Sequence, residues 1–255
     1  MRTELETAIH AIHLRYGSQA LRRADALAAP APWRVGIEAV ERLSGIGGLP
    51  LGRLTVLQGI GTCGKLSFGL AMLARATHDF ARAVVLDQGL GFDPWALLPL
   101  RPQLAALTVV RPPGDEAAGE AATALAKAGA GFLLTPPLPE AWLNTLEAAA
   151  ARSGSVIVVV AETASPALAH ASSLSFSFER LRWDRERGQL VGLSFRVRCL
   201  KNKVGMPGLE AEMEVRYPLG ATVFFEQPLQ TADQVGETEW QELGQEEEEA
   251  RSAVG

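Results

Sequence analysis

The strongest constraint on the fold is a glycine-rich turn that stands between a predicted strand and a predicted helix. The strand covers residues 53–58 and is followed by the sequence GIGTCGK from Gly59 to Lys65. This is the G-x-x-x-x-G-K pattern in the strand–turn–helix context that a phosphate-binding loop requires. Glycines let backbone amides surround a phosphate group, while the helix N-terminus and the lysine add positive charge. The chain is therefore predicted to contain an α/β core built around such a loop.

The loop departs from the pattern at the position after the lysine. A serine or threonine there binds the magnesium ion of the nucleotide, and here the residue is Leu66. Ser67 follows one residue later, about 100° further around the helix, so it does not simply take this role. The candidate nucleotide-binding residues of the loop are Gly59, Gly61, Gly64, Lys65 and Ser67.

The rest of the core alternates between strands and helices. Short apolar runs typical of buried strands occur at 83–87, 107–111, 131–135 and 155–161. Helices are predicted at 116–128 and 139–153. This alternation predicts a mostly parallel sheet that helices cover on both faces. Alternating polar and apolar residues then predict antiparallel strands that extend the sheet, at 173–182, 190–200 and 210–217.

Three regions are predicted: an N-terminal helix with a proline-containing linker (1–32), the core (33–225) and an acidic tail (226–255). The helix, at 3–23, has an apolar stripe at helical spacing, which predicts a docking or oligomerisation surface. Packing on its own domain is the alternative. The stripe consists of Leu5, Ile9, Ile12 and Tyr16.

The tail has nine acidic residues and one basic residue, whereas residues 1–225 have 20 acidic and 23 basic residues. This composition favours a solvated, disordered segment. Shielding of a protein that meets polyanions is the alternative. Trp240 is an isolated aromatic residue within the tail and predicts a short partner-docking peptide.

Several classes of protein are disfavoured by composition. No apolar run reaches the roughly 18 residues of a spanning helix, and the N-terminus lacks the apolar core of a signal peptide. We therefore expect a cytoplasmic protein without membrane contact. Cys63 and Cys199 are far apart, and the four histidines form no metal-binding pair. Neither a disulfide scaffold nor a metal site is predicted.

Four segments of the chain resemble the bacterial RecA recombinase family. Residues 43–67, LSGIGGLPLGRLTVLQGIGTCGKLS, are similar to its GGLP-x-G-R lead-in and phosphate loop. Residues 85–94 resemble the stretch that ends in Leu-Asp-Pro, and the N-terminal helix with Tyr16 resembles the helix that docks on the next subunit. In RCLKNK, residues 198–203, the resemblance implies that Lys201 and Lys203 reach the nucleotide of a neighbouring subunit. It covers about residues 5–225 and implies a RecA-like fold.

The residues that carry ATP hydrolysis in that family are replaced here. Gly89 matches the catalytic glutamate of the family, and Leu66 matches the residue whose hydroxyl binds magnesium. Thr135, which two prolines follow, matches an aspartate associated with magnesium. Glu162 matches a glutamine that senses the γ-phosphate. Hydrolysis needs a held metal and an oriented water. We therefore expect no efficient ATPase and no required cofactor. Two alternatives stay open: that the chain binds ATP without hydrolysing it efficiently, and that it has weak ATPase activity.

A cluster of arginines on the predicted hairpin is a candidate patch for DNA or an acidic partner. Positions of equal parity share a face of a strand, which predicts that Arg180 lies beside Arg182, and Arg196 beside Arg198. A solvated face offset by neighbouring acidic residues is the alternative. The segments after the last core strands are shorter than the DNA-binding loops of the family, so RecA-type strand exchange is not expected.

In length and in its eroded motifs the chain is most similar to the ImuA group of RecA-like proteins. This resemblance implies a non-catalytic adaptor in the bacterial DNA damage (SOS) response and translesion mutagenesis. Its implied partners are RecA, an ImuB-like polymerase-related protein, or both, with self-association, weak or indirect DNA binding and association with the nucleoid as further expectations. The alternatives are a DNA-dependent ATPase or recombination mediator that uses the loop, and a nucleotide sensor without turnover.

Overall fold

The chain divides into two compact units, Met1–Ala31 and Pro32–Gly255. The computed structural model describes residues 4–16, 30–89, 91–217 and 223–227. In the first unit, helix α1 (Glu4–Tyr16) contains the predicted apolar stripe. Residues 17–23 of the predicted helix and Trp240 with most of the acidic tail lie outside the described residues. No helix of the described part is long and apolar enough to cross a membrane.

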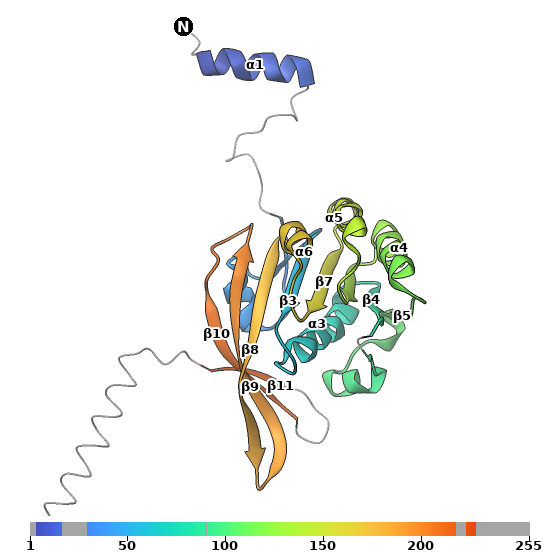
Figure 1. Ribbon diagram of the computed structural model, residues 1–255, viewed down its shortest axis with the longest axis vertical. Helices are drawn as coiled ribbons and strands as arrows, with labels where there is room; N and C mark the ends of the chain where they lie inside the picture. The colour runs from blue at the N-terminus through green and yellow to red at the C-terminus, as the bar shows by residue number, and fades with distance from the viewer. Residues whose placement is uncertain (1–3, 17–29, 90, 218–222, 228–255) are drawn as a thin grey trace, which may run out of the picture. The chain divides into compact units, whose positions relative to one another are not determined.

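The second unit is built on a mixed sheet, which Figure 1 shows at the centre of the core. Among the described residues the strand order is β11-β10-β9-β8-β3-β7-β6-β4-β5. The parallel strands are β3 (Leu54–Gln58), β4 (Ala83–Leu86), β5 (Leu107–Val110), β6 (Phe132–Thr135) and β7 (Val156–Ala161). Strand β8 (Leu174–Glu186) is parallel to β3 and begins the antiparallel extension. That extension continues with β9 (Gln189–Asn202), β10 (Glu210–Arg216) and β11 (Val223–Gln227).

Helices cover both faces of the sheet, as the alternating sequence pattern predicts. One apolar cluster joins the sheet to α2 (Glu38–Ser44) and α3 (Lys65–Asp79). The other joins it to α4 (Asp115–Lys127), α5 (Glu140–Ser153) and α6 (Pro166–Ala171). The shorter elements are β1 (Pro32–Trp33), β2 (Leu49–Pro50), and the 3-10 helices η2 (Pro94–Leu100) and η3 (Leu104–Ala106).

Strand β7 illustrates why a central parallel strand has an unbroken apolar sequence. Val158 packs in the cluster with α3, whereas its neighbours Ile157 and Val159 pack in the cluster on the opposite face. Successive side chains of a strand point to opposite faces, and both faces here are buried. The α/β fold with antiparallel C-terminal strands is therefore confirmed.

Two segments differ from the sequence-based expectation. The stretch predicted as a short link after β7 contains α6, because Ser165 caps it by accepting a hydrogen bond from the amide of Leu168 (3.2 Å) and Pro166 occupies the first turn. Strand β11 ends at Gln227, two residues into the segment predicted as tail. Both the Ser-Pro start of α6 and its six-residue length are easily overlooked in an apolar, alanine-rich stretch.

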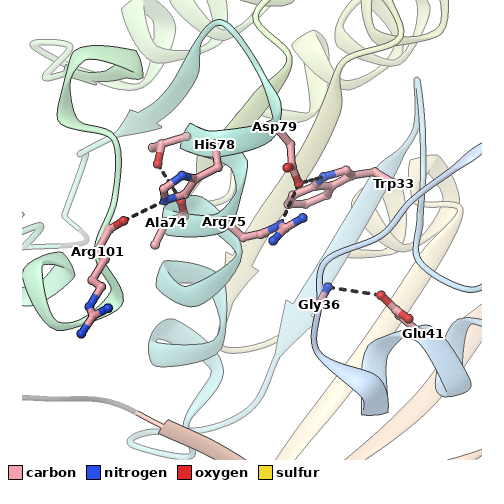
Figure 2. Close-up of polar contacts among 9 residues, drawn as sticks. Trp33, Gly36, Glu41, Ala74, Arg75, His78, Asp79 and Arg101 are labelled. Atoms are coloured by element: carbon pink, nitrogen blue, oxygen red, sulfur yellow. Dashed lines mark hydrogen bonds and ion pairs between the residues drawn. The ribbon is translucent and has the colours of Figure 1, made fainter.

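The C-terminal end of α3 is fixed to its surroundings by polar contacts (Figure 2). Asp79 accepts hydrogen bonds from the indole Nε1 of Trp33 (2.9 Å) and from Nε of Arg75 (2.8 Å). The His78 ring nitrogen lies 2.7 Å from the carbonyl oxygen of Arg101, at the end of η2. These contacts hold the C-terminal end of α3, the helix whose first residue is the loop lysine, Lys65.

Candidate functional site

The glycine-rich loop joins the end of β3 to the start of α3. The amide of Gly59 donates to the carbonyl oxygens of Ala161 (3.3 Å) and Glu162 (3.1 Å), which fixes the loop to the end of β7. The first backbone hydrogen bond of α3 runs from Phe68 to Gly64 (2.9 Å). The earlier amides of this turn therefore have no acceptor within the helix, and such amides are natural ligands for a phosphate group.

The hairpin strands β8 and β9 lie directly against this loop, and the glycines are needed for that approach. A Cβ atom at Gly59 would lie 2.4 Å from the carbonyl oxygen of Phe178, and one at Gly64 would lie 3.0 Å from the ring of Phe195. Gly61 has a φ of 61°, a left-handed conformation that favours glycine, but the space around it is open. The loop conformation thus depends on three glycines for two different reasons.

A cavity of about 550 Å³ opens beside the loop. At its wall Nζ of Lys65 donates to the carbonyl oxygen of Gly61 (2.7 Å) and lies 3.9 Å from Sγ of Cys63. The predicted loop residues Gly61, Gly64, Lys65 and Ser67 are therefore brought together around one space. Its lining consists of residues 61–67, Gly89, Pro136, Pro137, residues 160–162 and Tyr217.

The lining offers a magnesium ion few side-chain oxygens, those of Thr62, Ser67, Glu162 and Tyr217. Leu66 presents an alkyl side chain, and Gly89 has no side chain. The buried hydroxyl of Thr135 donates to the carbonyl oxygen of Pro136 (2.9 Å). In the described part of the chain, no group of three or more His, Cys, Asp or Glu residues could hold a metal ion. The loop amides and Lys65 fit a phosphate group, and Glu162 is the one carboxylate of the lining that a magnesium ion beside it would meet.

Tyr217 is a lining residue that sequence reasoning missed. It follows β10, its amide donates to the carbonyl oxygen of Val191 (2.7 Å), and its side chain forms a hydrogen bond with Ser67. Burial raises the pKa of the Tyr217 phenol, and the bond to Ser67 opposes this shift. The alternating pattern of residues 210–217 marks Tyr217 only as the end of a strand, so nothing local links it to a loop 150 residues away.

Asp87 shapes the segment that carries Gly89. Its carboxylate accepts from the amide of Phe92 (3.0 Å) and from Nε of Arg111 (2.8 Å). The Phe92 amide is the largest cause of a lowered pKa of Asp87, burial opposes it, and Arg111 lowers the pKa further. This carboxylate is therefore engaged in holding the turn after β4.

Lys201 and Lys203 do not lie at the loop of their own chain. Lys201 is paired with Ser175 near the start of β8, whereas the loop follows the C-terminal end of β3, which pairs with β8 at Ser177. Nζ of Lys203 donates to the carbonyl oxygen of His170 (2.9 Å) at the end of α6, and Lys201 donates to the same oxygen (3.0 Å). Burial, followed by the charge of Lys203, lowers the pKa of Lys201. That they reach a neighbouring subunit's nucleotide stays a prediction.

The parity prediction for the arginines is correct for one pair and wrong for the other. Arg196 and Arg198 share a face of β9, but a bulge in β8 between Arg180 and Arg182 turns these two to opposite faces. Arg180 lies on the loop side, where Nη1 donates to the carbonyl oxygen of Thr62 (3.3 Å). Its guanidinium also lies 5.0 Å from the centre of the Trp183 ring.

The remaining three arginines are paired with carboxylates. Arg182 forms an ion pair with Asp184 at 2.9 Å. Arg196 and Arg198 of β9 each lie directly opposite a glutamate of the neighbouring strand β10. The pairs in β9 and β10 are Arg196–Glu212 (2.6 Å) and Arg198–Glu210 (2.7 Å). Exposed pairs of this kind add little stability, but they offset the positive charge. This compensation favours a solvated face over a free patch for polyanions.

Comparison with known proteins agrees with this architecture. The chain is 25% identical to the RecA protein of Chlorobaculum tepidum, over 88% of this chain and 77% of that protein. It is also 25% identical to RecA of Aquifex pyrophilus, over 85% and 74% of the respective chains. It matches no protein-family model. A crystal structure of the RadB recombinase superposes with a TM-score of 0.57 at 14% identity and covers 74% of this chain. The fold is that of the RecA-like recombinases.

Proposed function

We propose that this chain is a non-catalytic RecA-like accessory protein that holds a phosphate-bearing nucleotide without efficient hydrolysis and acts through protein contacts. The observation that carries the proposal is the composition of the loop cavity. The loop and Lys65 are retained in the lining, while Leu66, Gly89 and, outside the lining, Thr135 stand at the positions that by the resemblance to RecA would control metal and water.

The physical argument concerns charge and positioning. Phosphoryl transfer depends on a metal ion that offsets the developing charge and on a group that orients the attacking water. A cavity with neither group still binds anions through its amides and lysine. The expected outcome is a nucleotide-binding site whose occupancy alters the shape or stability of the protein, with very slow turnover.

The proposed partners are RecA and an ImuB-like polymerase-related protein in the DNA damage response. Similarity to RecA over most of the chain supports a surface that resembles a RecA subunit. The compensated arginine face supports protein contact over direct DNA binding as the main activity. Equilibrium association with purified RecA, measured by light scattering or surface-based binding, tests the first partner; a chain that binds neither protein would contradict the adaptor role.

Phosphate release decides between this proposal and a DNA-dependent ATPase. We expect the wild-type chain to release phosphate from ATP no faster than the Lys65→Ala variant, with or without magnesium and single-stranded DNA. The preparation must be free of RecA, which is why the lysine variant, purified identically, is the matched control. Magnesium-dependent turnover that DNA stimulates and Lys65→Ala abolishes would instead establish the ATPase or recombination mediator.

A further inference from the structure

Glu162 is the one carboxylate in the lining of the loop cavity, among the described residues, and Lys65 is the one cation. Glu162 directly follows β7, and its backbone carbonyl receives the amide of Gly59 (3.1 Å). It also lines a second cavity of about 490 Å³, to which Gly59 and Ile60 contribute. The residue therefore stands beside the first residues of the loop, at the border of the two cavities.

The Glu162 side chain is exposed, and no ion pair or side-chain hydrogen bond joins it to another residue of the described part. Arg180 lines the second cavity too, but its guanidinium is directed at the carbonyl oxygen of Thr62 and at Trp183. Glu179, the other carboxylate of the second cavity, lies 3.8 Å from Arg196. The charge of Glu162 is thus left to act on whatever occupies the loop.

We propose that the site selects a nucleoside diphosphate over the triphosphate when magnesium is absent, and that Glu162 is the specificity-determining residue. The inference rests on the proposed phosphate site. Lys65 is the one cation of the lining and Glu162 offsets its charge, so a third phosphate adds repulsion from Glu162 with no second cation to compensate it. A magnesium ion would relieve that repulsion, and Glu162 is the carboxylate of the lining that such an ion would neutralise.

Calorimetric titration of the full chain with ADP and with ATP tests this inference, each with magnesium and with a chelator. We expect ADP to bind about tenfold more tightly than ATP in the chelator, and this difference to narrow when magnesium is present. Glu162→Gln keeps the size of the side chain and removes its charge. It should raise the affinity for ATP about tenfold and leave that for ADP within about twofold.

The matched control is Glu179→Gln, which removes an equal charge from a residue that lines only the second cavity. It should leave the ratio of ADP to ATP affinity unchanged. Equal affinity for the two nucleotides, unaltered by Glu162→Gln, would overturn the role of Glu162 and leave the phosphate site standing. Binding that survives Lys65→Ala, or no binding of either nucleotide, would overturn the phosphate site itself and this inference with it.

Discussion

At the scale of single residues, most of the site is lined by side chains that are small, apolar or already engaged, and Glu162 is the charged exception. Leu66 can be identified from the sequence because the loop motif fixes its position, and Gly89 because residues 85–94 resemble a stretch of the RecA family. The position of Tyr217 beside the loop, and the direction in which the Arg180 side chain points, cannot be identified from the sequence. Tyr217 reaches the loop through the order of strands in the sheet, and Arg180 faces it because of a bulge that a simple alternation does not reveal.

Asp87 provides a test of how the turn beside the cavity is held. We expect Asp87→Asn to be less stable than the wild type by about 1 kcal/mol near neutral pH, because a charged acceptor of the Phe92 amide and the ion pair with Arg111 are lost. The pKa of Asp87 is lowered from 3.8 in the folded state. Its contribution is therefore complete above that value and is lost as the pH falls through the lowered pKa.

Urea unfolding of both proteins at about pH 7 and about pH 3 measures this difference. The gap in the free energy of unfolding should narrow at the acidic end, because the unfolded chain, in which Asp87 has its ordinary pKa of 3.8, then binds a proton that stabilises it relative to the charged folded form. A gap that stays constant, or widens in acid, would show that the Asp87 carboxylate does not hold the turn in its charged form.

At the scale of elements, the alternation of strands and helices was predictable because apolar runs and turns punctuate the sequence locally. The start and end of the central strands fall within one or two residues of the expected ranges, as β4 (Ala83–Leu86) does for 83–87. Helix α6 was missed because its signal is only a Ser-Pro start. The ion pairs between β9 and β10 were also missed, since which glutamate faces which arginine depends on strand register.

The contact between the loop and the β8–β9 hairpin is an element-scale property that one substitution can test. Gly59→Ala should destabilise the protein by about 1–3 kcal/mol, because the added Cβ atom would meet the Phe178 carbonyl oxygen at 2.4 Å and Sγ of Cys63 at 2.6 Å. Gly61→Ala is the matched control in the same loop. With open space around it, it should cost only the conformational term of about 1 kcal/mol.

Chemical denaturation of the two variants separates crowding from backbone strain. The larger loss is expected at Gly59 even though only Gly61 has a left-handed φ. If the two variants were equally stable, or if Gly61→Ala were the weaker protein, the loop would not be packed against β8 as closely as described.

At the scale of the whole molecule, the two apolar clusters account for the second unit without help from the first. Every described residue of both clusters lies within residues 32–255, and the first strand pairing begins at Pro32. Hydrophobic burial is the main source of folding free energy, so a unit that contains its complete clusters should fold alone. That the first unit contacts another protein stays the prediction made from the apolar stripe of α1.

Removal of residues 1–31 tests whether the second unit folds alone and whether the first unit is needed for partner binding. The fragment 32–255 should unfold within about 2 °C of the full chain in a thermal melt, because no described core residue is removed. Its association with purified RecA should weaken about tenfold or more, since the proposed docking helix is gone. In the full chain, Ile12→Ser should weaken association in the same direction, whereas His10→Ser, on an exposed position of the same helix, should not. A fragment that melts far below the full chain would place α1 in the core, and unchanged RecA binding would remove α1 from the partner surface.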